Sequence, residues 1–153
     1  FGAFCDLAAS YELRVGVEFY PPSQVQSLAD ALELVAAINR PGRVGVNVDL
    51  LHLMRSGGSI AELAAAPADY ILYGQVADGA AECPADRIDF EASSARLLPG
   101  EGVFDIAGFV RTLPKDCPIS VEIPRNADLE AGMPVAERVR RAVDGVRQAL
   151  AAG

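Results

Sequence analysis

Alternating apolar and polar positions predict four short strands in this chain. The four segments are 13–20 (LRVGVEFY), 43–50 (RVGVNVDL), 70–78 (YILYGQVAD) and 118–124 (PISVEIP). Because side chains of a strand point alternately to its two faces, each segment has one apolar face and one face with small or polar residues. In the first segment, Val15 and Val17 share one face while Gly16 and Glu18 share the other. The apolar faces are expected to pack against helices.

Apolar residues at helical spacing predict helices between and after these strands. The expected helices are 23–39, 59–65, 106–113 and 134–152. The first is predicted to start at Ser23, so that Val25 belongs to its apolar stripe. The stripe of the last helix consists of Val135, Val139, Val143, Val146 and Leu150. Strands that alternate with helices favour a parallel sheet with right-handed crossovers.

The length of the chain bears on the fold class. Four βα units in 153 residues correspond to half of a (β/α)8 TIM barrel, which typically needs about 250 residues. The chain also opens on FGAFCDLAASYEL, which resembles the inside of a helix and has no initiator Met. We therefore expect residues 1–153 to be the C-terminal half of a single TIM-barrel domain whose N-terminal half is missing. An open doubly wound sheet is the rival fold, but the phosphate-binding GxGxxG and Walker patterns do not occur here.

Composition and charge exclude several classes of protein. Apolar residues make up 51% of the chain and the net charge is -8, which is typical of an acidic globular domain. A broad basic surface for nucleic acid is not expected, and no apolar run approaches the roughly 20 residues of a membrane span. The three cysteines form no CxxC pair, which favours reduced thiols and a cytoplasmic location.

A polar side chain stands near the carboxyl end of each predicted strand. These residues are Glu18, Asp49, Gln75 and Glu122. Barrel enzymes place their chemistry at this end of the sheet. A single glutamate at such a position is more often solvated, but three carboxylates together repel one another unless a cation lies between them. Because all four groups offer oxygen atoms, the set predicts one divalent ion, Mn²⁺ or Mg²⁺.

Five sequence motifs carry a resemblance to a known family. They are VEFYP around Glu18, NVDLLHLMRSGG around Asp49 and His52, YGQVAD around Gln75, RLLPGEGVFD from Arg96, and SVEIP around Glu122. In this order they resemble the second half of the xylose isomerase-like TIM-barrel superfamily. That superfamily includes sugar isomerases, ketose 3-epimerases and 3-dehydroshikimate dehydratases.

The resemblance implies a role for each candidate residue. Glu18, Asp49 and Glu122 match the carboxylate metal ligands of the family. Gln75 falls where many epimerases have His and where dehydroshikimate dehydratases have Gln. His52 matches the histidine of a DxxH motif, which binds a substrate oxygen or moves a proton.

An arginine completes the set of candidates. The arginine that epimerases carry shortly after the third ligand is not evident in VADGAAECPADR. Arg96, which precedes LPGEG, is the expected contact for a substrate anion or hydroxyl group, and Arg87 is the second candidate.

The resemblance implies a metal-dependent sugar or sugar-phosphate isomerase or epimerase that works through a metal-stabilised enediolate. Glu18 and Glu122 would then exchange protons on opposite faces of the substrate. The runner-up is a 3-dehydroshikimate dehydratase-like lyase with His52 as the base. A catalytically silent sugar-binding module or scaffold is the alternative from another class. The expected partner is a small sugar, sugar phosphate or polyhydroxy acid, and open sheet edges leave pairing into a homo-oligomer open.

Overall fold

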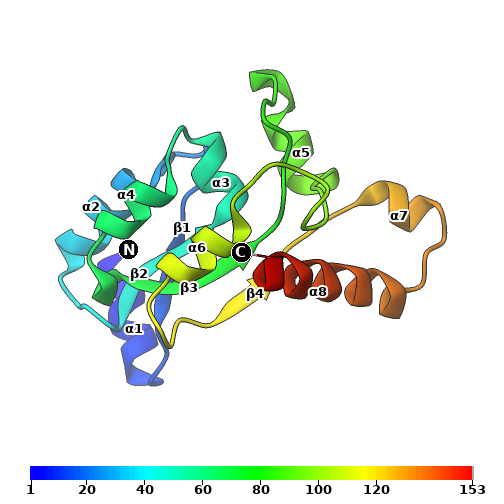
Figure 1. Cartoon of the computed structure of the whole chain (residues 1–153). Helices are drawn as coiled ribbons and strands as arrows, with labels where there is room; N and C mark the ends of the chain where they lie inside the picture. Colours follow the sequence, from blue (N-terminus) through cyan, green and yellow to red (C-terminus); the bar gives the residue numbers. More distant parts are fainter. Residues whose placement is uncertain (153) are drawn as a thin grey trace.

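The computed structural model describes residues 1–152, which form one parallel sheet flanked by helices (Figure 1). The strands lie side by side in chain order and are β1 (Val15–Glu18), β2 (Val44–Asp49), β3 (Ile71–Val76) and β4 (Ile119–Val121). All neighbouring pairs are parallel, and Asp49 of β2 lies opposite Gln75 of β3. The four predicted strands are confirmed. Because β4 ends at Val121, Glu122 comes directly after the strand.

Helices connect and flank the strands. They are α1 (Gly2–Ser10), α2 (Leu28–Ile38), α3 (Leu50–Arg55), α4 (Ile60–Ala65), α5 (Ile88–Ser94), α6 (Ile106–Thr112), α7 (Asn126–Glu130) and α8 (Val135–Ala152), with 3-10 turns η1 (Ala68–Tyr70) and η2 (Ala85–Arg87). The four helices predicted between and after the strands correspond to α2, α4, α6 and α8. Helices α3, α5 and α7 were not predicted, and α5 and α7 have no side-chain cap at their N-terminus.

The predicted start of the first helix was wrong. Helix α2 begins at Leu28, after Ser27, whose side chain accepts a hydrogen bond from the backbone N–H of Asp30. The Asp30 carboxylate accepts in return from the N–H of Ser27, which completes a capping box. Ser23 instead forms a local turn, since its hydroxyl accepts from the N–H of Val25. Val25 therefore packs against the core from outside the helix.

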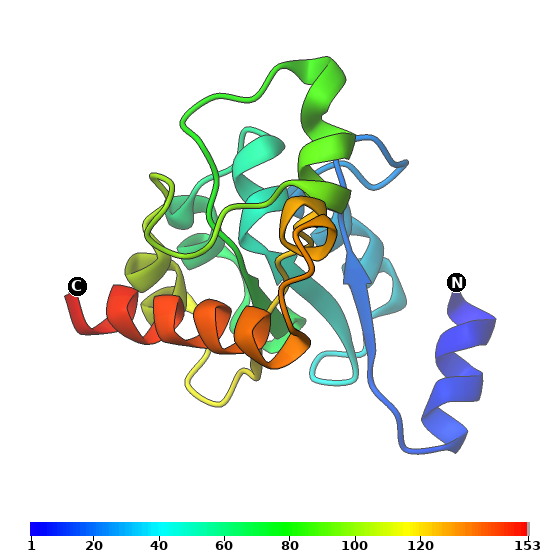
Figure 2. The same ribbon diagram turned by 90° about the vertical axis from the view of Figure 1, so that its right-hand side faces the viewer.

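The core lies between the sheet and the helices that cover one of its faces. Val44, Val46 and Val48 of β2 are buried beneath α2, which contacts that strand more than any other element outside the sheet. Helices α1 and α8 lie at opposite ends of the molecule (Figure 2). The other face of the sheet carries Gly16 and Asn47, which line a solvent-accessible hollow of about 400 Å³.

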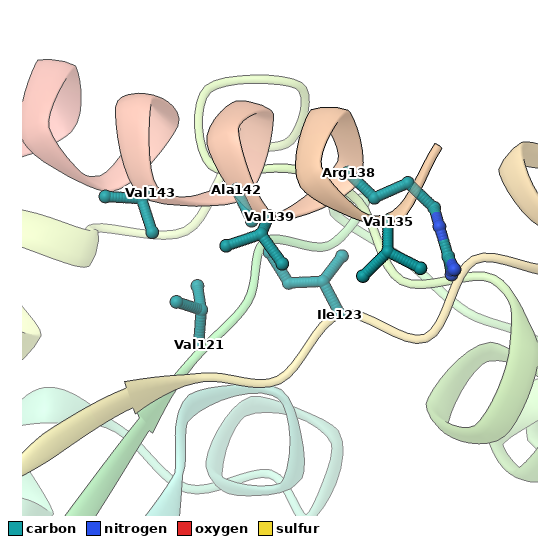
Figure 3. Close-up of a pocket in the computed structure, with 7 residues that line it drawn as sticks. All are labelled: Val121, Ile123, Val135, Arg138, Val139, Ala142 and Val143. Carbon is teal, nitrogen blue, oxygen red and sulfur yellow. The ribbon is translucent and has the colours of Figure 1, made fainter. Parts of the chain in front are cut away.

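The apolar stripe of α8 faces strand β4 across an open groove. Figure 3 shows Val135 and Val139 of the helix above Val121 and Ile123. The groove has a volume of about 270 Å³, and Val139 keeps 56% of its surface exposed. The predicted stripe therefore points toward the sheet, but it is less buried than the faces of α2 and α6. Within residues 1–152, no helix is both long and apolar enough to span a membrane.

Candidate functional site

The predicted metal ligands gather at the carboxyl end of the sheet. Glu18 and Asp49 are the last residues of β1 and β2, Gln75 is the penultimate residue of β3, and Glu122 follows β4. A cavity of about 400 Å³ lies beside them. Its lining consists of Glu18, Tyr20, His52, Asp89, Ala92, Ser93, Arg96 and Glu122. The structure therefore places all four predicted ligands, His52 and Arg96 in or next to one site.

Asp49 is the buried anchor of this site, with no exposed surface. The chain turns directly from β2 into α3, so that Asp49 is the N-cap of that helix. Its Oδ1 accepts hydrogen bonds from the backbone N–H groups of Leu51 at 2.7 Å and His52 at 3.2 Å. Its Oδ2 accepts from Nη1 of Arg96 at 2.5 Å. The carboxylate is thus held in one orientation from both sides.

Arg96 is almost as deeply buried, with 3% of its surface exposed. Its Nε donates to the carbonyl oxygen of Ala92 at 2.8 Å, and its Nη1 donates to that of Glu122 at 3.1 Å. Its Nη2 lies 3.5 Å from Oε2 of Glu122. The arginine expected at the site is therefore present, and it bridges Asp49 and Glu122.

A row of side-chain amides crosses the sheet toward Glu122. Nδ2 of Asn47 donates to Oε1 of Gln75, and Nε2 of Gln75 donates to Oε2 of Glu122 at 2.8 Å. Asn47 was not among the predicted site residues. The sequence could have indicated Asn47, because strand alternation puts this residue on the same face as Asp49.

His52 and Glu18 lie next to each other in the lining of the cavity, with 3.6 Å between Nε2 of His52 and Oε1 of Glu18. Burial lowers the pKa of His52, so the imidazole is held neutral at neutral pH. Its ring lies against that of Tyr20, with 4.9 Å between the centroids. Burial, together with a hydrogen bond donated to Asp89, raises the pKa of Tyr20 to about 12. Tyr20 and Asp89 were missed, although Tyr20 stands two positions after Glu18 in the same extended segment.

The charges of the site do not balance. Burial raises the pKa of Glu18 to about 6, and repulsion from Glu122 and Asp49 adds to this effect. Burial also raises the pKa of Glu122. The carboxylates of Glu18, Asp49 and Glu122 face the single guanidinium of Arg96, which leaves an excess of two negative charges among these four groups, and Asp89 also lines the cavity. Ligand atoms of Glu18, Asp49 and His52 lie within 4.8 Å of one another. A divalent cation fits this donor set, since it would neutralise the excess.

The raised pKa of Glu18 gives the metal-free protein a predictable pH dependence. The ordinary value is 4.5 and the folded value is about 6, so between these values the folded state binds more protons than the unfolded state. The free energy of unfolding therefore falls as the pH rises through this window. Relative to the Glu18→Gln variant, the wild-type protein should lose stability between pH 4.5 and 6. Urea unfolding of both proteins in EDTA measures the difference, and a pH-independent difference would contradict the assignment.

A loop that supports Arg96 is organised by a buried carboxylate. Asp78 is 2% exposed and accepts hydrogen bonds from the backbone N–H groups of Gly79, Gly100, Gly102 and Phe104. A Cβ atom at Gly102 would lie 2.2 Å from the carbonyl oxygen of Gly79, so this position requires glycine. Asp78 also exchanges two backbone hydrogen bonds with Leu97, the residue after Arg96. These contacts hold the arginine in place.

Comparison with known families gives a match over nearly the whole chain. The model of the xylose isomerase-like TIM barrel family matches residues 1–149. The chain belongs to this family. The fold class predicted from the strand and helix pattern is confirmed, because four parallel βα units correspond to half of the family's barrel. Comparison with curated protein sequences found no match.

Solved structures of similar fold include a protein with a bound zinc atom, an epimerase and a probable dehydratase. The IOLI protein with a bound zinc atom has a TM-score of 0.82 at 23% identity, over 99% of this chain and 54% of that one. D-psicose 3-epimerase, solved with D-fructose, has a TM-score of 0.68 at 15% identity, over 97% and 53%. The probable 3-DHS dehydratase AsbF from Bacillus anthracis has a TM-score of 0.68 at 18% identity, over 92% and 51%. The chain thus spans about half the length of these proteins, and the likeness is one of fold.

Proposed function

We propose that this chain carries the metal-binding half of the active site of a divalent-metal-dependent isomerase or epimerase that acts on a sugar or sugar phosphate. The proposal rests on one observation: carboxylates from β1, β2 and the end of β4 meet beside one cavity with two negative charges uncompensated. The fold is shared with a 3-epimerase that was solved with a ketose, which supports the choice of reaction class.

Oxygen atoms dominate the proposed metal site. Glu18, Asp49, Gln75 and Glu122 would hold the ion, and this donor set favours Mn²⁺ or Mg²⁺ over softer metals. His52 lies close enough to add a nitrogen donor. That nitrogen keeps zinc, which the IOLI neighbour binds, among the metals to be tested. When bound, a divalent cation supplies a Lewis acid that polarises a substrate carbonyl group.

The two glutamates are placed for proton transfer. Glu18 ends β1, Glu122 directly follows β4, and these are the two outermost strands of the sheet. Both residues line the same cavity, so a substrate between them would meet one carboxylate on each face. In an epimerisation, one carboxylate would remove the proton from the carbon next to the carbonyl group. The other would return a proton to the opposite face. A raised pKa suits both roles, and that of Glu18 lies at about 6, close to neutral pH. Burial raises the pKa of Glu122 as well.

Dehydration of a 3-dehydroshikimate-like substrate is the second candidate function. It is favoured by His52, because burial keeps its imidazole neutral and so available as a base. AsbF, described as a probable 3-DHS dehydratase, shares the fold. Formation of an ultraviolet-absorbing aromatic product from dehydroshikimate would support the lyase. Incorporation of solvent deuterium into a ketose without loss of water would support the epimerase.

Metal removal tests the proposal as a whole. Treatment of the protein with EDTA should abolish turnover of the substrate, and addition of Mn²⁺ or Mg²⁺ should restore it, because the proposed reaction needs a cation to polarise the substrate carbonyl group. Epimerisation is followed on a panel of ketoses and ketose phosphates, with calorimetric titration of the metal in parallel. Turnover that persists in EDTA would refute the metal-dependent mechanism. Metal binding without turnover on any substrate would favour a sugar-binding module.

A further inference from the structure

Asn47 occupies a central position that the proposed mechanism does not use. It lies in the middle of β2, directly opposite Glu18 of β1. Its amide nitrogen, Nδ2, donates a hydrogen bond to Oε1 of Gln75. Its oxygen, Oδ1, is buried and has no hydrogen-bond partner among residues 1–152. A buried acceptor without a partner is costly, so its presence in a row of polar groups calls for a physical reason.

The orientation of Gln75 supplies that reason. In this structure the amide oxygen of Gln75 faces Asn47, and its amide nitrogen faces Glu122. This orientation satisfies a metal-free site, because an N–H donor meets a carboxylate. It cannot serve a cation, because the nitrogen of a neutral amide carries no ligand electron pair. To offer its oxygen beside Glu122, the amide of Gln75 has to turn over.

Turning Gln75 over has a consequence for Asn47. The NH₂ group of Gln75 would then point at the NH₂ group of Asn47, and two donors would oppose each other. The conflict disappears if Asn47 turns over as well, since its oxygen then accepts from Gln75. That oxygen is the atom which has no partner in the present arrangement.

We propose that Asn47 is a positioning residue whose side-chain amide turns over together with that of Gln75 when a divalent cation binds. This inference rests on the proposed metal site. Asn47 touches neither the cation nor the substrate. Asn47 determines whether Gln75 turns its N–H donor or its oxygen toward the Glu122 side of the site. In this way it couples the presence of the metal to the orientation of both amides.

Nuclear magnetic resonance observes the two amides directly. The side-chain NH₂ signals of Asn47 and Gln75 are assigned by their loss from the Asn47→Leu and Gln75→Leu variants. Titration of the wild-type protein with Mg²⁺ should shift both pairs of signals together, because each NH₂ group changes its partner. The signal of Asn126, an exposed residue of α7, is the internal control and should stay in place. A shift of Gln75 alone would overturn the proposal.

A double-mutant cycle tests whether Asn47 acts through Gln75. Calorimetric titration with Mn²⁺ should give a dissociation constant about tenfold higher for Asn47→Leu than for wild type, which is the usual effect of losing a group that orients a ligand. In the Gln75→Leu background, the Asn47→Leu substitution should have no further effect. Asn47→Asp, which can only accept, should bind Mn²⁺ at least as tightly as wild type. The Asn126→Leu variant controls for the substitution itself.

The outcomes separate the two proposals. Failure of the wild-type protein to bind Mn²⁺ would refute the proposed metal site, and this inference with it. Binding by the wild type that is unchanged in Asn47→Leu would refute only the role of Asn47. Additive effects of Asn47→Leu and Gln75→Leu on Mn²⁺ binding would also refute only the role of Asn47, because additivity means that the two residues act independently. Thermal melting of each variant shows that the compared proteins are folded.

Discussion

Replacement of Glu122 with Gln is expected to lower kcat by about 100- to 10,000-fold, which is the range that a positioned acid or base contributes. Gln has nearly the same shape as Glu, but it neither accepts nor returns a proton at neutral pH. The side chain of Glu122 is 41% exposed, so the substitution should leave the fold intact. Steady-state kinetics on the substrate identified by the panel, with Mn²⁺ at saturation, measure the effect.

A matched substitution separates proton transfer from a change of charge. Glu101→Gln removes one carboxylate from a partly exposed ion pair with Arg125, at a position outside the lining of the cavity. It should leave kcat within about twofold of wild type, because exposed ion pairs contribute little. Near-normal turnover in Glu122→Gln at saturating metal would remove Glu122 from the mechanism.

Replacement of Arg96 with Met is expected to lower the free energy of unfolding by about 3–5 kcal/mol in the absence of metal, because it leaves a buried charge without its partner. Asp49 has no exposed surface, and Arg96 is the guanidinium that pairs with its Oδ2. Met fills much of the same volume but carries no charge. Glu18, Asp49 and Glu122 would then have no guanidinium beside them.

The same variant should respond more strongly to metal than the wild-type protein. A divalent cation beside Asp49 would replace part of the lost positive charge, so Mn²⁺ should recover more stability in Arg96→Met than it adds to wild type. Urea unfolding with and without Mn²⁺ measures both quantities. Arg140→Met is the control, because Arg140 is 61% exposed and its ion pairs lie on the surface of α8. An Arg96→Met protein as stable as this control in EDTA would show that the buried pair does not stabilise the fold.

The strands and the four polar residues near their ends could be predicted because both depend on short-range regularities. Period-2 alternation identified β1 to β4, and it put Glu18, Asp49 and Gln75 on the face away from the buried valines. The parallel arrangement followed from the helices between the strands. The start of α2 was missed, because a capping box at Ser27 decides it and the apolar spacing of Val25 does not.

Other features of the site depend on residues far apart in the chain. Arg96 and Asp49 are separated by 47 positions, and so are Gln75 and Glu122. The sequence pointed to Arg96 only as a contact for substrate, and its pairing with Asp49 emerged from the fold. Asp89 lies on the short helix α5 and accepts a hydrogen bond from Tyr20, but no apolar repeat in the sequence predicts that helix.

By itself, the sequence determined which residue types stand near the end of each strand, and therefore which donors a cation would meet. It did so because alternation is a local property of an extended backbone. Only the tertiary structure decided which charges pair, which way the amides of Asn47 and Gln75 face, and which carboxylates have raised pKa values. Those properties depend on distance and on the removal of water, and neither is encoded in the spacing of residues along a chain.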